Sequence, residues 1–134
     1  QLRVAEARRR VDRNPSDLSA RYDLGAGLLE AGETDDAIAE LQQAVKDPRK
    51  KTDAMFLLGS AFQHKELYDL ALGQYEKALA AASGGARAKE ALYAMGVICE
   101  AQSKPEDALR HFTKILEQDI GFRDVAKKVE ALKG

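Results

Sequence analysis

Histidine and cysteine are the side chains most able to do chemistry near neutral pH, and this chain has three of them: His64, Cys99 and His111. Neither histidine has a Cys, Asp or His at a metal-ligand spacing that recurs elsewhere. The glycine-rich stretch Ser83–Gly85 lacks the Lys and Ser or Thr that follow in a phosphate-binding loop. The sequence therefore predicts no catalytic residues, no metal site and no cofactor, and we expect a protein that is not an enzyme.

Two basic clusters, Arg8–Arg10 and Arg49–Lys51, have the residue types that contact nucleic-acid phosphates. No aromatic residues are interleaved with them, and the whole chain has 21 basic against 22 acidic residues, a net charge of −1. A nucleic-acid-binding domain usually has a basic excess. We interpret both clusters as solvated surface and expect no nucleic-acid partner.

With 134 residues, 45% of them apolar, the chain can form one soluble domain with its own core. No apolar run approaches the roughly 20 residues of a membrane helix, so we expect no membrane insertion. The lone Cys99 favours a reducing compartment, and a cytoplasmic location is the expectation. The chain begins at Gln1, without Met and in mid-pattern, which indicates a fragment of a longer protein.

Apolar residues recur at intervals of three and four along the chain, and no segment alternates with period two for long enough to be a strand. This pattern predicts eight helices and no sheet. Pro15, Pro48 and Pro105 each mark a place where the periodicity restarts. Ser16 or Asp17 is expected to cap one helix, and Ser103 and Glu106 have the spacing of a capping box around Pro105.

Three helical hairpins repeat in register. Gly25, Gly59 and Gly96 are separated by 34 and 37 residues, and so are Ala37, Ala71 and Ala108. The three extra residues lie in the linker at Ser83–Gly85. We expect Gly and Ala where two helices cross closely, with the larger Leu41, Tyr75 and Phe112 filling the space beside them. Cys99 falls in a core column, where a small buried thiol of low reactivity is expected.

A helical hairpin with a period near 34 resembles the tetratricopeptide repeat. The large-then-small pairs Leu24–Gly25, Leu58–Gly59 and Met95–Gly96 match that family, although its tryptophan is absent. The resemblance implies an all-α, right-handed superhelical array of antiparallel hairpins in a single domain. Its predicted parts are the second helix of a partial repeat (1–14), three repeats (18–51, 52–85 and 89–120) and a capping helix (121–134). That last helix is expected to turn Phe122, Val125, Val129 and Leu132 inward and Lys127, Lys128 and Glu130 outward.

The resemblance further implies a concave groove lined by the first helix of each hairpin, where a non-catalytic interaction module or scaffold would bind a peptide or partner surface. The expected groove residues are Tyr22, Ala26, Leu29, Glu30, Phe56, Ser60, Gln63, His64, Tyr93, Val97, Glu100 and Ala101, with Asp23, Asp53 and Glu90 on the flank. This aromatic and acidic face suits a partner with apolar anchors and basic residues.

Two alternatives remain open at this point. The aromatic ladder of Tyr22, Phe56 and Tyr93 could be filler between neighbouring first helices, and not a ligand contact. The chain could also assemble with copies of itself as a homo-oligomer, because Leu2, Val4 and Val11 of the first helix need cover. A chaperone-tail adaptor is not expected, since its cationic clamp positions hold Tyr22, Ala26, Leu57, Glu90 and Ala94.

Overall fold

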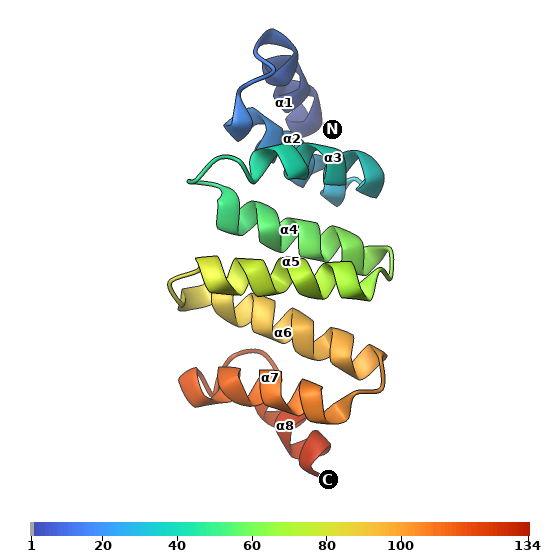
Figure 1. The fold of residues 1–134 in the computed structure, drawn as a ribbon, viewed down its shortest axis with the longest axis vertical. Helices are drawn as coiled ribbons and strands as arrows, with labels where there is room; N and C mark the ends of the chain where they lie inside the picture. The colour runs from blue at the N-terminus through green and yellow to red at the C-terminus, as the bar shows by residue number, and fades with distance from the viewer. Residues whose placement is uncertain (1) are drawn as a thin grey trace. The chain divides into compact units, whose positions relative to one another are not determined.

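The computed structural model describes residues 2–134 and contains helices joined by short turns (Figure 1). Within that range there are eight helices and no strand, which confirms the predicted all-α fold. The helices are α1 (Leu2–Arg13), α2 (Leu18–Glu30), α3 (Thr34–Ala44), α4 (Lys51–His64), α5 (Tyr68–Ala81), α6 (Gly85–Ala101), α7 (Pro105–Gln118) and α8 (Val125–Lys133). The chain forms two compact units, one up to Ala81 and one from Ala82. The predicted single domain and the hand of its superhelix stay predictions.

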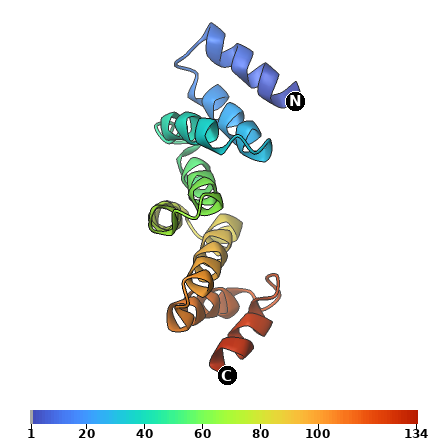
Figure 2. The ribbon, with the colours of Figure 1, turned by 90° about the vertical axis from the view of Figure 1, so that its right-hand side faces the viewer.

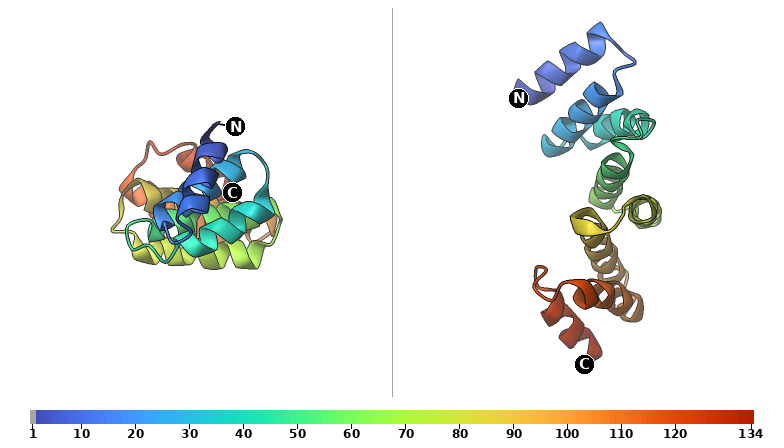
Figure 3. Two further views of the ribbon diagram at one scale, coloured as in Figure 1. Left: turned by 90° about the horizontal axis from the view of Figure 1, so that it is seen from above. Right: turned by 90° about the vertical axis from the view of Figure 1, so that its left-hand side faces the viewer.

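Successive helices pack on each other within each unit. In the first unit α1 packs on α2, α2 on α3, α3 on α4 and α4 on α5; in the second, α6 packs on α7 and α7 on α8. Figures 2 and 3 show from opposite sides that α1 lies beside α2 and that α8 lies beside α7. The three predicted hairpins are therefore α2–α3, α4–α5 and α6–α7, each closed by a turn of only three residues.

Glycine is required where the two helices of each hairpin cross. A Cβ added at Gly25 would lie 2.7 Å from Leu41 Cγ, one at Gly59 would lie 2.8 Å from the Tyr75 ring, and one at Gly96 would lie 2.6 Å from the Phe112 ring. These distances are shorter than any van der Waals contact of carbon, so no larger residue fits without displacing the ring or the leucine. The crossing points predicted from the repeat are confirmed.

The turn inside each hairpin has a residue in the left-handed conformation at the same position. These residues are Gly32, Glu66 and Ser103, with φ of 83°, 58° and 59°. In the third turn the Lys104 N–H donates to the Cys99 carbonyl, and the other two turns have the corresponding bond. This pattern is the Schellman motif, which satisfies the last carbonyls of a helix.

The capping box predicted for Ser103 and Glu106 is wrong. Because Ser103 adopts the left-handed conformation that ends α6, it precedes the N-cap position of α7, which Lys104 occupies without a side-chain bond. Pro105 is the first residue of α7, as predicted. At the start of α2, Asp17 is the residue that caps, since its side chain accepts a hydrogen bond from the Ala20 N–H at 3.0 Å.

Two helix starts differ from the sequence-based boundaries. Helix α6 begins at Gly85, the last residue of the predicted linker, because Ala86, Arg87 and Ala88 are good helix formers. Helix α8 begins at Val125, not after Gly121, because Asp119 accepts the N–H groups of Gly121 and Phe122 in a loop. Phe122 therefore precedes the capping helix and does not belong to its apolar side.

Helix α1 has more cover than the sequence indicated. Val11 is buried, and Val4 lies so close to Gly27 of α2 that an added Cβ would be 2.9 Å from Val4 Cγ2. Of the three residues expected to need cover, Leu2 is the one that is still uncovered, with 85% of its surface exposed. The expectation that all three lack cover within the chain is therefore wrong.

Candidate interaction surface

The side chains able to do chemistry differ in their exposure. His64 is exposed at the end of α4, whereas His111 and Cys99 are buried in the second unit. Burial raises the pKa of the Cys99 thiol, which lowers its reactivity. Among residues 2–134 no group of three or more His, Cys, Asp or Glu side chains is placed to hold a metal ion.

On α2, the predicted groove residues differ in their exposure and in their contacts. Tyr22 and Leu29 are half-buried, Glu30 is exposed, and Ala26 retains only 8% of its surface. The Lys50 ammonium lies 5.0 Å from the centre of the Tyr22 ring, in the geometry of a cation–π contact. Arg3 of α1 donates a hydrogen bond to the Glu30 carboxylate at 3.0 Å. Two of the four residues therefore already have a cationic neighbour from the same chain.

On α4, three of the four predicted residues, Phe56, Ser60 and Gln63, interact with Tyr75 of α5. The Tyr75 hydroxyl donates to Gln63 Oε1 at 2.7 Å, and its ring packs edge-on against Phe56 with centroids 5.4 Å apart. Burial raises the pKa of Tyr75 to about 12, against a smaller opposing effect of the Ser60 hydroxyl. Phe56, Ser60 and Gln63 are half-buried, so the hairpin holds one side of each while the other meets solvent.

On α6, the predicted residues are held by the segment that leads into α8. The Tyr93 hydroxyl donates to Asp124 Oδ1 at 2.7 Å, and the Arg123 guanidinium lies 4.9 Å from the centre of the Tyr93 ring. Lys128 of α8 donates to Glu100 Oε1 at 2.9 Å. Val97 is half-buried between these two positions on the helix.

The contacts on α6 shift the pKa of Tyr93, Asp124 and Lys128 in the directions expected for favourable pairs. Burial, with the Asp124 carboxylate beside it, raises the pKa of Tyr93, and the Tyr93 hydroxyl lowers the pKa of Asp124. The hydrogen bond to Glu100 raises the pKa of Lys128. These groups therefore remain paired at neutral pH.

Sequence reasoning missed the role of the segment before α8. Lys128 was predicted to point outward, but its side chain is only 24% exposed because it turns back to Glu100. Arg123 and Asp124 were not singled out at all. The sequence did contain a signal: Phe122, Arg123 and Asp124 are consecutive, and an aromatic and a basic side chain are complementary to an aromatic and acidic helix face.

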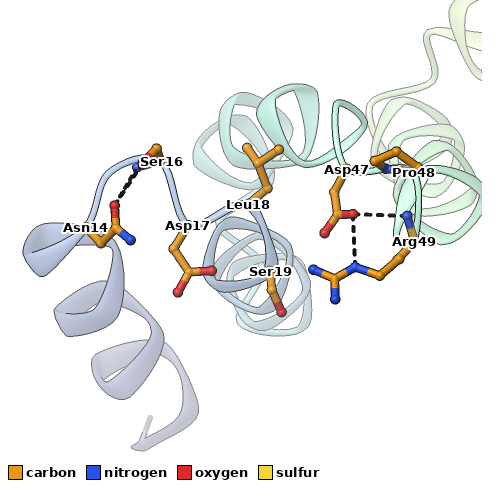
Figure 4. A pocket seen from close by; sticks show the side chains of 8 residues that line it. All are labelled: Asn14, Ser16, Asp17, Leu18, Ser19, Asp47, Pro48 and Arg49. Carbon is orange, nitrogen blue, oxygen red and sulfur yellow. Dashed lines mark hydrogen bonds and ion pairs between the residues drawn. The ribbon is translucent and has the colours of Figure 1, made fainter.

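A separate polar pocket of about 350 Å³ lies in the first unit, between the α1–α2 and α3–α4 loops (Figure 4). Asn14 Oδ1 accepts from the Ser16 N–H, and Asp47 Oδ1 accepts from the Arg49 N–H, each across an intervening proline. Asn and Asp side chains commonly close turns in this way. The polar groups of this pocket thus serve their own loops, and we assign it no ligand.

The fold and the faces of α2, α4 and α6 together define a helical repeat protein whose hairpins carry mixed aromatic and polar faces. The family model of the tetratricopeptide repeat matches residues 2–45, 22–86 and 56–121. The chain therefore belongs to the tetratricopeptide repeat family, as the sequence analysis expected. No curated protein matches the sequence significantly.

Solved structures with the same fold are distant in sequence. The crystal structure of MamA is similar at a TM-score of 0.85 with 19% identity, over 96% of this chain and 74% of that one. YrrB, described as "a TPR protein with an unusual peptide-binding site", is similar at 0.77 with 19% identity, over 94% of this chain and 63% of that one. The first repeat domain of Spaghetti (RPAP3), "bound to HSP90 peptide SRMEEVD", is similar at 0.75 with 16% identity, over 87% and 90%.

One further finding concerns membranes: no helix among residues 2–134 is long and apolar enough to cross one.

Proposed function

We propose that this chain is a non-catalytic protein-interaction module that binds a peptide or partner surface along the first helices of its hairpins. The observation that carries the proposal is the character of the α4 face. Phe56, Ser60 and Gln63 are half-buried there and His64 is exposed, while the opposite side of α4 is fully packed. An ordered, partly solvated face with an aromatic side chain is the usual composition of a peptide-binding surface.

Two of the similar structures support this class of function by their descriptions, which name a peptide-binding site and a bound peptide. We do not extend the HSP90 peptide to this chain. The positions of a cationic clamp hold Tyr22, Ala26, Leu57, Glu90 and Ala94, none of which can pair with a terminal carboxylate. The acidic residues Asp53 and Glu30 instead favour a partner with basic residues and apolar anchors.

The test is partner capture with matched substitutions. We expect His64→Arg to weaken binding of the captured partner about threefold to fivefold, because it adds a cation to a face that would meet basic residues. Gln42→Arg is the control, since Gln42 is exposed on α3, outside the proposed face. Equal affinities of the two variants would contradict the proposal. Replacing Tyr22 and Phe56 together by Ala should abolish capture in a protein that still folds.

A structural role in self-assembly is the second candidate, and exposed Leu2 is the observation that favours it. Val4 and Val11 no longer support this role, because α2 covers both. Sedimentation at increasing concentration tests it directly. A chain that stays monomeric would rule out self-assembly, whereas a dimer that Leu2→Glu dissociates would support it.

A further inference from the structure

The face of α6 in the second unit is already in contact with another part of the chain. The loop after α7 places Phe122, Arg123 and Asp124 on it. The Phe122 and Tyr93 ring centroids are 6.1 Å apart, Arg123 lies over the Tyr93 ring, and Asp124 accepts the Tyr93 hydroxyl. One helical turn later, Lys128 reaches Glu100. An aromatic, a basic and an acidic side chain in succession thus contact the residues predicted to bind a partner.

This loop is attached differently from the helix that follows it. Helix α8 is anchored by Val125 and Val129, which are buried. Apart from the edge-on contact between the Phe122 and Tyr93 rings, the loop is held by polar contacts at the surface: Arg123 is 54% exposed, its ion pair to Glu90 spans 4.0 Å, and Lys89 pairs with Asp119 at 3.0 Å. Solvent and salt weaken such contacts far more than they weaken apolar burial. The loop is therefore more weakly attached than α8.

The backbone of the loop is strained at the residue that makes most of these contacts. Arg123 has a φ of 45°, in the left-handed region that a side chain disfavours. Such conformations persist where surrounding contacts impose them, and they occur often at ligand clamps and switches. In that conformation Arg123 contacts Tyr93 and Glu90.

We propose that the loop from Asp119 to Asp124 is an internal ligand of α6, and that it marks the chemistry of the partner which replaces it. That partner is a peptide with an aromatic residue followed by Arg or Lys. The aromatic side chain would pack on Tyr93, and the cation would pair with Glu90. This inference deepens the proposed function and rests on it for its biological role.

The first experiment supplies the segment in trans. A fluorescently labelled peptide of residues 119–130 is titrated into the wild-type chain and into an opened variant with Arg123→Ala, Asp124→Ala and Lys128→Ala. We expect at least tenfold tighter binding to the opened variant by fluorescence anisotropy. Adding Tyr93→Ala to that variant, or replacing the Phe and Arg of the peptide by Ala, should abolish the gain. Equal affinity for both chains, no binding to the folded opened variant, or a gain that survives Tyr93→Ala would overturn the proposal.

The second experiment needs no substitution, so it stands even if the opened variant fails to fold. Hydrogen exchange of the wild-type chain is followed as the salt concentration rises. The Phe122 amide, which bonds within the loop, should exchange at least tenfold faster in high salt, while the Val129 amide in α8 stays protected. Parallel acceleration of both amides, or no acceleration, would overturn the proposal. Both experiments concern α6 alone, so failure of the α4-directed capture test remains a separate result.

Discussion

The hairpins α4–α5 and α6–α7 each contain one Phe and one Tyr ring in contact, but the Tyr is on the second helix of the first hairpin and on the first helix of the other. In the first, Phe56 of α4 meets Tyr75 of α5; in the second, Tyr93 of α6 meets Phe112 of α7. The centroid distances are 5.4 and 5.5 Å, and the interplanar angle is 61° in both. Edge-on packing of aromatic rings is favourable, so the ring geometry is common to both hairpins.

The position of the hydroxyl group decides which part of the chain each hairpin engages. On α5 it points back into the hairpin, where Gln63 accepts it and the first helix needs no further partner for that group. On α6 it points outward, and Asp124 from the loop before α8 accepts it. One oxygen atom thus distinguishes a hairpin satisfied internally from one that recruits a neighbouring segment.

The largest expected change in stability tests the helix crossing that the two hairpins share. Gly59→Ala and Gly96→Ala should each lower the free energy of unfolding by about 1 to 3 kcal/mol, because the added methyl group meets the Tyr75 or Phe112 ring. Gly73→Ala is the control: nothing lies within 4 Å of its Cβ position in α5, so this change should stabilise by about 0.5 to 1 kcal/mol. Urea denaturation measures all three. A neutral Gly96→Ala would mean that Phe112 can move aside.

A smaller effect should separate the two hydroxyl groups. Tyr75→Phe should cost about 0.5 to 1.5 kcal/mol, because it removes a hydrogen bond at a buried ring and leaves Gln63 without its donor. Tyr93→Phe should cost less, since Asp124 is exposed and regains water. Thermal or urea unfolding of the two variants compares them. If Tyr93→Phe proved the more costly, the contact with Asp124 would be more than a surface bond.

The sequence was sufficient for the features that depend on repeated local packing. Gly25, Gly59 and Gly96 recur at fixed spacing because each crossing needs the same missing side chain, so the hairpins could be predicted. A cation from the following loop lies over a first-helix tyrosine in two places, Lys50 over Tyr22 and Arg123 over Tyr93. The contacts of Asp124 with Tyr93 and of Lys128 with Glu100 depend on a loop geometry that no periodicity encodes. Ser103 was misassigned for a related reason. A serine just before a helix looks like an N-cap residue in the sequence, but here Ser103 adopts the left-handed conformation of the preceding turn and does not cap α7.

Placing glycine in the turns of α4–α5 and α6–α7 should stabilise the two hairpins by similar amounts. Glu66 and Ser103 occupy the left-handed position that Gly32 holds in the first hairpin. Glycine there relieves strain of about 1 to 2 kcal/mol but adds disorder to the unfolded chain, so Glu66→Gly and Ser103→Gly should each stabilise by about 0.5 to 1 kcal/mol. Chemical denaturation checks this. Destabilisation by Glu66→Gly would indicate that its side chain contributes more than its backbone costs.

The smallest effect is a dependence on acid that the second unit should show and the α4–α5 hairpin should lack. Hydrogen bonds from Lys89 and Tyr93 lower the pKa of Asp119 and Asp124 from their ordinary value near 3.8. A carboxylate whose pKa is lower in the folded state stabilises fully above its unfolded pKa, and that contribution is lost as the pH falls through the folded value.

Contacts of the loop with α6 should therefore weaken below about pH 4, whereas the neutral Tyr75–Gln63 bond should not respond there. Hydrogen exchange between pH 3 and pH 6, corrected for the intrinsic rate, compares the Phe122 amide with that of Gln63. In the variant with Asp119→Asn and Asp124→Asn, the Phe122 amide should exchange equally fast across this range. Equal responses of the two amides in the wild-type chain would mean that acid loosens the fold generally, and that the exchanged hydroxyl does not set the difference between the hairpins.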